Sequence, residues 1–137
     1  MEPGNHTWKT EDKLTRTRRS ARQAGSRFER EIADYLAEHV DDRIDRRVKT
    51  GAKDKGDIAG LRHMGEKIAV EAKNYGGRLH AGPWVKEAHI AAGNDDAPAG
   101  IVVAKRRGTT NPGEQFVLMT VDDLIAIITG QRPNGYP

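Results

Sequence analysis

An aspartate stands ahead of an apolar run that ends in a glutamate and a lysine, and this pattern narrows both the possible folds and the possible chemistry of the chain. The two segments are Gly56-Asp57-Ile58-Ala59-Gly60 and, after a short turn, Lys67-Ile68-Ala69-Val70-Glu71-Ala72-Lys73. Both are typical of β-strands, whose side chains alternate between two faces. The apolar residues of the second run would face one way, while Glu71 and Lys73 face the other. A hairpin would bring Asp57 beside them, so two carboxylates and one ammonium are expected to meet.

These residue types together suit a metal-dependent site that cuts phosphodiester bonds. Mg²⁺ prefers oxygen ligands and keeps several waters, so Asp57, Glu71 and the backbone carbonyl of Ala72 would suffice to hold it. Such an ion can lower the pKa of a bound water and stabilise charge on the phosphate. Lys73 could position that water or neutralise the developing anion. The alternative is a solvated Glu–Lys pair on an exposed strand face.

A third carboxylate is expected on a helix. Residues 26–40 predict an amphipathic helix, because apolar residues recur at spacings of three and four, namely Phe28, Ile32, Tyr35, Leu36 and Val40. On a helical wheel Glu29 lies between Leu36 and Val40 instead of on the polar arc. A glutamate at the edge of a buried stripe is costly unless it is paired or near a metal. We therefore expect Glu29 at the same site, with an edge glutamate that reaches water as the alternative.

In this order Glu29, Asp57 and Glu71-Ala72-Lys73 resemble the acidic set and lysine of the PD-(D/E)XK nuclease superfamily. Within it, the chain is most similar to the archaeal-type Holliday-junction resolvases, over roughly residues 24–106. The matching segments are Gly25-Ser26-Arg27-Phe28-Glu29-Arg30-Glu31, Arg46-Arg47-Val48-Lys49-Thr50-Gly51, Asp57-Ile58 and Ile68 to Lys73. Gly56 replaces the proline of the family name. The residues after the lysine, Asn74-Tyr75-Gly76-Gly77, do not select one branch of the superfamily.

The resemblance implies an α/β fold, a restriction-endonuclease-like three-layer sandwich with a central mixed β-sheet flanked by helices. It implies a hydrolase that uses Mg²⁺, with Mn²⁺ as a substitute, to cut branched DNA as a Holliday junction resolvase. Glu29, Asp57 and Glu71 would be the catalytic acids and Lys73 the catalytic lysine. The metal would be held by Asp57, Glu71, Ala72 and Glu29.

The resemblance also implies a homodimer that serves DNA recombination, DNA repair or phage-type replication. Two alternatives stay open. One is a flap- or end-processing nuclease, or another DNA nuclease of the same superfamily. The other is a non-catalytic DNA-binding module on this fold. An intact acidic set favours an enzyme, because a binding module gains nothing by holding three acids near phosphates.

Length and composition exclude several other classes of protein. A chain of 137 residues is expected to form one domain with a modest core. It contains no cysteine, which excludes a disulfide framework and a cysteine-based zinc site. No apolar run approaches a membrane span, and the N-terminus lacks the apolar core of a signal peptide. We therefore expect a cytoplasmic protein that does not contact a membrane.

The positive charge is unevenly distributed, although the net charge is only +3. Three clusters stand out: Lys13, Arg16, Arg18, Arg19, Arg22, Arg27 and Arg30; Arg43, Arg46, Arg47, Lys49, Lys53 and Lys55; and Lys105-Arg106-Arg107. Such clusters suit the phosphate backbone of nucleic acids. The residues that we expect to contact DNA are Arg18, Arg19, Arg22, Arg27, Arg46, Arg47, Lys49, Lys53 and Lys55. Ordinary solubilising surface is the alternative.

The chain divides into an arm and one domain. Residues 1–20 lack apolar periodicity and predict a flexible basic arm, and residues 21–137 predict a single nuclease domain. Helices are expected at 21–39, at 84–93, and from an N-cap at Thr120 to Gly130. Strands are expected near 44–50, 57–62, 67–73, 101–104 and 116–120. The helix at 84–93 and residues 116–129 are candidates for the dimer interface.

The remaining candidates depend on single residues. Lys86 could be an auxiliary polar residue of the site, although a solvated lysine is the simpler interpretation. Tyr75 and Trp84 could stack on unpaired bases, or could serve only in packing. His80 and His89 are isolated, so no histidine metal site is predicted.

Overall fold

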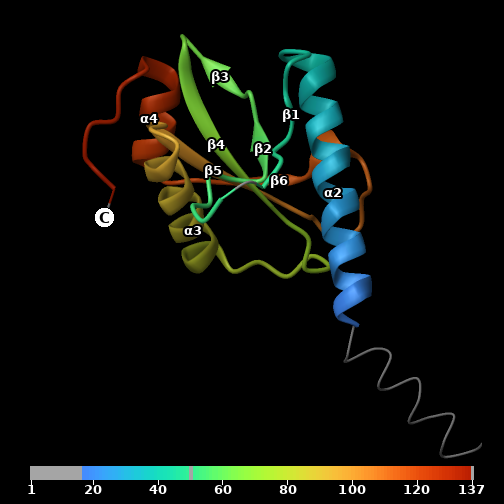
Figure 1. Ribbon diagram of the computed structural model, residues 1–137. Helices are drawn as coiled ribbons and strands as arrows, with labels where there is room; N and C mark the ends of the chain where they lie inside the picture. Colours follow the sequence, from blue (N-terminus) through green and yellow to red (C-terminus); the bar gives the residue numbers. More distant parts are fainter. Residues whose placement is uncertain (1–16, 50, 137) are drawn as a thin grey trace, which may run out of the picture.

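One mixed sheet flanked by helices makes up the described part of the chain. The computed structural model describes residues 17–49 and 51–136 (Figure 1). The elements in chain order are α2 (Arg18–His39), β1 (Asp45–Arg46), β2 (Ile58–Ala59), β3 (Arg62–His63), β4 (Glu66–Lys73), α3 (Ala81–Asn94), β5 (Ala99–Ala104), the 3-10 turn η1 (Pro112–Glu114), β6 (Phe116–Leu118) and α4 (Val121–Thr129).

The sheet has six strands, with the order β1-β2-β4-β5-β6 and with β3 paired to β4. β4 and β5 run parallel, from Ile68 opposite Ala99 to Lys73 opposite Ala104, and α3 forms the crossover between them. The other pairs are antiparallel. The strand after Asp57 was predicted to pair with β4 through a hairpin, and the structure places Ile58 opposite Val70. β5 is buried along its whole length, which confirms the buried strand expected at 101–104.

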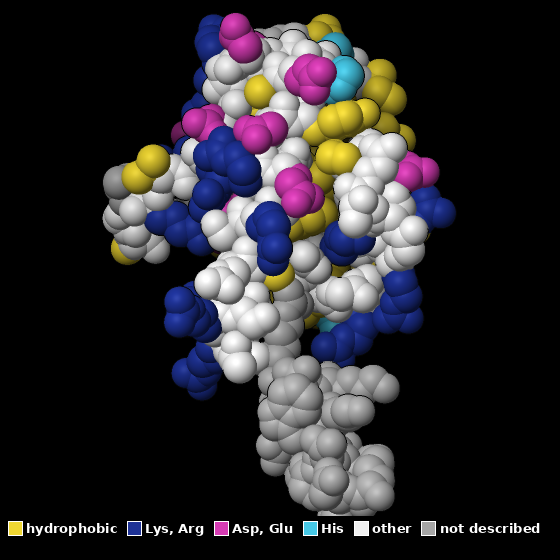
Figure 2. Space-filling model, turned by 90° about the vertical axis from the view of Figure 1, so that its right-hand side faces the viewer, with side chains coloured by type: hydrophobic (Ala, Val, Ile, Leu, Met, Phe, Trp, Pro, Cys, Tyr) yellow, Lys and Arg dark blue, Asp and Glu magenta, His cyan; other side chains and the backbone are white. Residues whose placement is uncertain are grey.

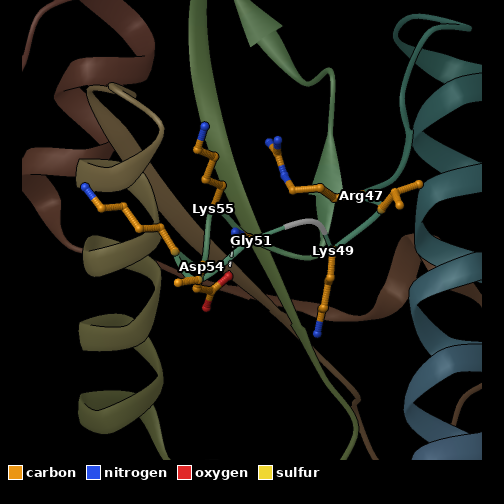
Figure 3. A pocket seen from close by; sticks show the side chains of 9 residues that line it. Arg47, Lys49, Gly51, Asp54 and Lys55 are labelled. Atoms are coloured by element: carbon orange, nitrogen blue, oxygen red, sulfur yellow. Dashed lines mark hydrogen bonds between the residues drawn. The ribbon is translucent and has the colours of Figure 1, made fainter.

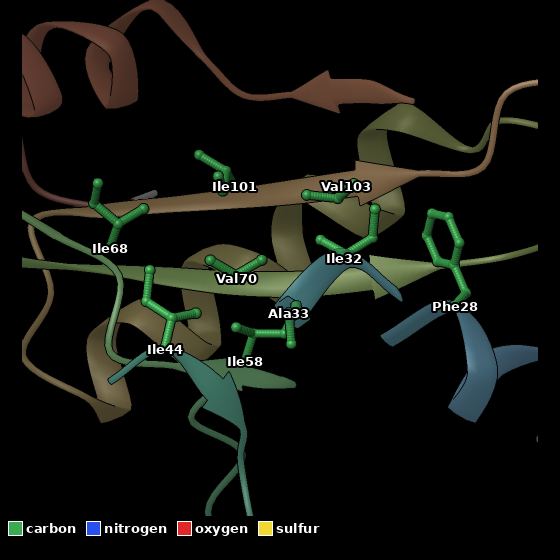
Figure 4. Close-up of a cluster of buried hydrophobic side chains, with 9 residues drawn as sticks. All are labelled: Phe28, Ile32, Ala33, Ile44, Ile58, Ile68, Val70, Ile101 and Val103. Carbon is green, nitrogen blue, oxygen red and sulfur yellow. The ribbon is translucent and has the colours of Figure 1, made fainter. Parts of the chain in front are cut away.

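The larger core lies between α2 and one face of the sheet. The Thr17 side chain caps α2 by accepting a 3.0 Å hydrogen bond from the N–H of Ser20. The apolar side of α2 then packs on strand residues, and the buried cluster comprises Phe28, Ile32, Ala33, Ile44, Ile58, Ile68, Val70, Ile101 and Val103 (Figure 4). The prediction that alternate residues of β4 face this core is confirmed by Ile68 and Val70.

Alanines form the core on the opposite face. Ala91 and Ala92 of α3 are fully buried with Ala69 of β4, and Ala88 packs with Val102 of β5. Figure 1 shows α2 on one side of the sheet and α3 with α4 on the other. The expected α/β architecture, a mixed sheet with flanking helices, is therefore confirmed.

Several predicted boundaries were wrong. β1 has two residues instead of the seven expected at 44–50, because the chain leaves the sheet after Arg47 donates its N–H to the carbonyl of Asp57. The expected strand 57–62 is divided into β2 and β3, because Gly60 and Leu61 lie in neither strand and Gly60 has a φ of +94°. The helix expected at 84–93 begins at Ala81.

The first helix begins at Arg18 instead of residue 21, because Thr17 provides its cap. Arg18 and Arg19 are therefore helical. The rest of the predicted basic arm, residues 1–16, lies outside the described residues. Within the described ranges, no helix is long and apolar enough to cross a membrane.

Candidate active site

A cleft of about 740 Å³ opens where β4 ends. α2 lines one wall and Glu87 of α3 contributes to another, while the end of β4 and the turn that follows complete the lining. The lining residues are Ala21, Gly25, Glu29, Lys49, Asp54, Asp57, Glu71, Ala72, Lys73, Asn74, Tyr75, Arg78 and Glu87. All five residues expected from the sequence to act or to bind metal thus line one cleft.

Asp57 is fixed through both its backbone and its side chain. Its N–H donates to the carbonyl of Val70 at 2.8 Å, and its own carbonyl accepts from the N–H of Arg47 at 2.8 Å. Its Oδ2 accepts a 2.9 Å hydrogen bond from the N–H of Ala72. The N–H and C=O of a strand residue point to the same side, so the Ala72 carbonyl faces this side too.

Gly56 explains how the chain enters Asp57 without the proline of the motif that the sequence resembles. Its φ is +100°, in the left-handed region. A Cβ at this position would lie 2.9 Å from the carbonyl oxygen of Val70. Proline holds φ near −65°, so it cannot adopt this conformation. Glycine is the residue that both the backbone angle and the close approach to β4 require.

Glu71 is the most buried acid of the cleft. Its side chain is 3% exposed, and its Oε1 has no hydrogen-bond partner. Burial raises the pKa of Glu71 far above its usual range, and the neighbouring carboxyl groups of Asp57 and Asp54 raise it further. The cleft therefore crowds more carboxyl groups together than can all be ionised without a cation.

Asp54 is an acid of the cleft that the sequence did not reveal. Burial opposes ionisation of Asp54, but hydrogen bonds from Glu71 and from the N–H of Gly56 outweigh it and lower the pKa of Asp54. The sequence signal was its position three residues before Asp57, between Lys53 and Lys55. The surrounding lysines made it resemble ordinary solvated surface.

Glu29 lies at the edge of the cleft. Its carboxylate is 3.5 Å from Nε of Arg46, and its side chain is 20% exposed. Burial raises the pKa of Glu29, and the negative charge of Asp57 raises it further, while Arg46 and Lys49 act in the opposite direction. The buried-edge position expected for this glutamate is therefore present, and it is partly compensated by an arginine.

Lys73 is held at the cleft by an acid from α3. Its Nζ lies 2.6 Å from Oε2 of Glu87. Burial acts to lower the pKa of the Lys73 amine, but the hydrogen bond and charge of Glu87 outweigh it and raise the pKa. The sequence pointed to Lys86 instead, which is exposed and does not line the cleft. Only the rotation of α3 on the sheet decides between these two neighbours.

The donor set fits a hard cation that keeps part of its water shell. Among residues 17–49 and 51–136, no three acidic or histidine side chains form a group that could hold a metal ion by themselves. Mg²⁺ does not need such a cage, since one or two carboxylates and several waters are usual. Asp57, Glu71 and the carbonyl of Ala72 supply oxygen ligands, and the unpartnered Oε1 of Glu71 is available for one. Glu29 stands at the edge of this set.

The basic residues of α2 lie on the surface beside the cleft. Arg18, Arg19, Arg22 and Arg27 are exposed. Figure 2 shows the face that carries α2, on which Lys and Arg side chains prevail in the lower half and acidic side chains occur in the upper half. The lower half corresponds to the N-terminal part of α2 in Figure 1. Positive charge therefore lies along the helix that forms one wall of the cleft.

The loop after β1 forms a second, smaller hollow of about 420 Å³. Lys49 turns away from Arg47 and Lys55 (Figure 3), and its Nζ lies 3.7 Å from Oδ1 of Asp57. Arg47 pairs with Asp95 at 3.2 Å. Lys53 and Lys55 are exposed. The structure thus brings Lys49 to the cleft and Arg46 to Glu29, while the guanidinium of Arg47 is engaged elsewhere.

His89 lies in a buried network away from the cleft. Its Nε2 is 2.8 Å from Oδ2 of Asp123, and Arg132 binds the other oxygen of Asp123 at 2.6 Å. The ring of Tyr136 packs under the guanidinium of Arg132 at 4.1 Å. This network joins α3, α4 and the C-terminal segment.

Comparisons of the chain with protein-family models, with curated proteins and with solved structures find no significant match. The site is therefore characterised by its own residues. It is a cleft in which Asp57, Glu71 and Lys73 meet at the end of β4, with cationic side chains on its flanks.

Proposed function

We propose that this protein is a divalent-metal-dependent, structure-selective DNA endonuclease of the PD-(D/E)XK type. The proposed fold is the restriction-endonuclease-like three-layer sandwich, which the mixed sheet between α2 and α3 supports. One observation carries the proposal. Glu71 is buried with an unpartnered oxygen, in the same cleft as Asp57 and Lys73. This arrangement is costly unless a cation binds there.

The residues have distinct roles in the proposed hydrolysis. Asp57, Glu71 and the carbonyl of Ala72 would hold Mg²⁺ or Mn²⁺, with Glu29 at the edge. When bound, the ion supplies a more acidic water and offsets charge on the phosphate. Lys73 orients the attacking water or neutralises the developing anion. Glu87 holds the amine of Lys73 in position at 2.6 Å.

The acids favour an enzyme over a DNA-binding module. Like charges repel, and the effect is stronger in a partly buried cleft than in water. The carboxylate of Asp57 would therefore weaken binding of a phosphate in the absence of a cation. A module that only binds DNA would gain nothing from acids that repel phosphate.

The substrate that we propose is branched DNA, with the four-way Holliday junction as the leading candidate. Arg18, Arg22 and Lys49 give the cleft cationic flanks for a long polyanion. A junction presents two strands for symmetric cutting, which a two-fold homodimer with one site per protomer would accomplish. A flap- or end-processing role is the alternative within the same chemistry.

The decisive experiment offers the protein a four-way junction, a linear duplex, a flap and a single strand. We expect cleavage of the junction with Mg²⁺ or Mn²⁺. Ca²⁺ is larger and acidifies water less, so it should permit binding with little turnover. Full activity in excess chelator would exclude the metal mechanism. Preference for the flap would support end processing, and tight binding with no cleavage in any metal would support the binding module.

A further inference from the structure

An exposed tyrosine ring lies on the cleft beside the proposed reaction centre. Tyr75 follows Lys73 by two residues and lines the same cleft. Its side chain is 46% exposed, whereas aromatic rings are usually largely buried. An exposed ring at the opening of a polar cleft is available to a ligand with a flat apolar face.

Two further rings support Tyr75 from the protein side. Its centroid lies 5.1 Å from that of Trp84 and 6.3 Å from that of His80. Trp84 is only 4% exposed and packs with Ala88 and Val102. Trp84 is therefore a core residue that cannot stack on a base itself. Of the two roles that the sequence left open for Trp84, stacking on bases or packing, the structure supports packing. Tyr75 alone of the pair presents a ring to solvent.

The backbone that carries Tyr75 is a tight turn. Its carbonyl accepts a 3.2 Å hydrogen bond from the N–H of Arg78, and Asn74 Oδ1 accepts a 3.1 Å hydrogen bond from the N–H of Gly76. Gly76 and Gly77 have φ values of +64° and +95°, as in a type I′ turn. The turn follows β4 directly, so the ring is held at a fixed place relative to Lys73.

The surroundings of the ring indicate what ligand it would take. Arg78 and Lys73 line the cleft on either side of Tyr75 along the chain and can bind phosphate oxygens. A ligand with a phosphate and an attached flat ring is a nucleotide. In a continuous duplex the faces of each base are covered by its neighbours. A base at a branch point can expose one face.

We propose that Tyr75 is a stacking platform for one unstacked base next to the phosphate that binds at Asp57, Glu71 and Lys73. The inference rests on the proposed nuclease function and adds a source of its selectivity. Stacking on the ring rewards DNA whose bases are already free, so branched DNA is preferred over continuous duplex. A single base–aromatic contact of this kind corresponds to roughly a 10-fold gain in affinity.

The test is a double-mutant cycle in which the Tyr75 ring and the DNA base are removed singly and together. The affinity for DNA is measured by fluorescence anisotropy in Ca²⁺. The ligands are a four-way junction, the same junction with single abasic sites at the branch point or within an arm, and a linear duplex. The variants are Tyr75→Phe, which keeps the ring, and Tyr75→Leu, which removes it. Tyr35→Leu is the matched control, because Tyr35 is 36% exposed on α2 and does not line the cleft.

We expect Tyr75→Leu to lose roughly 10-fold in affinity for the junction and almost nothing for the duplex, while Tyr75→Phe and Tyr35→Leu bind like the wild type. An abasic site at the branch point should cost the wild type the same factor and cost Tyr75→Leu nothing further. The abasic series on the wild type tests the base without any variant.

Equal losses for duplex and junction, or fully additive effects of the two changes, would overturn the platform. Because the assay measures binding alone, a protein that shows this cycle but never cleaves would refute the nuclease and leave the platform standing. A protein that cleaves DNA but shows no coupling between the Tyr75 ring and the base would refute the platform and leave the nuclease standing.

Discussion

The Asp57 carboxylate accepts a 2.9 Å hydrogen bond from the backbone N–H of Ala72, which ties the first acid of the cleft to the strand that carries the second. Removal of this carboxylate would leave the N–H of Ala72 without its partner. Asparagine retains an oxygen that can accept the same bond. Asp57→Asn therefore removes charge with little change in geometry, which makes it the informative substitution.

Asp57→Asn and Glu71→Gln should each abolish metal-dependent cleavage while DNA binding is retained or strengthened. Each change removes a ligand that the cation needs, and Asp57→Asn also removes a negative charge that repels phosphate. Glu66→Gln is the matched control, because Glu66 lies exposed at the opposite end of β4. Single-turnover cleavage and junction affinity should be measured together. A wild-type rate for either cleft variant would show that the site is misassigned.

The pH dependence of stability should reveal Glu71 in the metal-free protein. Burial and the neighbouring Asp57 raise its pKa from 4.5, so the folded protein binds a proton that the unfolded chain releases. The free energy of unfolding therefore falls as the pH rises above about 4.5. Glu71→Gln cannot release this proton, and between about pH 5.5 and about pH 8 it should lose less stability than the wild type.

Thermal melts of both proteins in chelator and in Mg²⁺ test this expectation. In chelator, the variant should gain roughly 5 °C on the wild type at the higher pH. Mg²⁺ should reduce the difference, because it favours the ionised carboxylates of the wild type. Parallel melting curves for the two proteins at all pH values would contradict the assignment of the buried charge to Glu71.

Lys73→Ala should lower the cleavage rate by on the order of 10²-fold or more at saturating DNA, as expected for a lost contact to the transition state. Glu87→Ala leaves the amine in place but unanchored, so a smaller loss of roughly 10-fold is expected. Lys67→Ala serves as the control on the same strand, since Lys67 is engaged with Asp95. An unchanged rate for Lys73→Ala would remove the lysine from the mechanism.

The arginines of α2 should account for part of the salt dependence of DNA binding. Arg18, Arg19 and Arg22 are exposed at the N-terminal end of the helix that lines the cleft. Substitution of all three by alanine should lower the slope of log affinity against log salt by roughly 2 to 3 for every DNA shape. Arg62→Ala on β3 is the control. Identical slopes would assign the contact to Arg46, Lys49, Lys53 and the rest of the loop.

The outer face of α4 should form the homodimer interface. Four exposed aliphatic residues recur there at helical spacing, Val121, Leu124, Ile125 and Ile128. An apolar stripe on the outer side of a helix is normally covered by another surface. These four residues carry no charge, so two copies could meet across a two-fold axis without repulsion. We expect Leu124→Glu to yield a monomer.

Light scattering checks this expectation, with Met64→Glu as the control because Met64 is equally apolar and 66% exposed elsewhere. Cleavage of a junction on both strands should be impaired by Leu124→Glu and unaffected by Met64→Glu. A wild-type protein that is monomeric both free and on a junction would point to a flap- or end-processing nuclease.

Local patterns predicted much of this fold and most of the cleft. The alternation along β4 correctly separated Val70 from Glu71, because a strand has a strict period of two. The helical spacing around Phe28 and Ile32 located α2, and the cap at Thr120 located α4, where a capping box and a left-handed Gly130 are both present. Each of these depends only on residues close together in the chain.

What could not be predicted depends on contacts between distant segments. Glu87 and Lys86 are adjacent, and only the packing of α3 against β5 turns one of them toward Lys73. Asp54 enters the cleft because the loop after β1 folds back, and its lysine neighbours conceal it in the sequence. The short length of β1 reflects the departure of that same loop from the sheet.

Gly56 limits how this site can be altered by substitution. A left-handed residue pressed against Val70 can change to proline only if the loop that carries Asp54 follows another path. A substitution at position 56 alone would displace Asp57 and so disrupt the cleft in which Asp57 meets Glu71 and Lys73. Position 56 is therefore coupled to the path of the loop that carries Asp54, and a proline there would require that loop to be rebuilt.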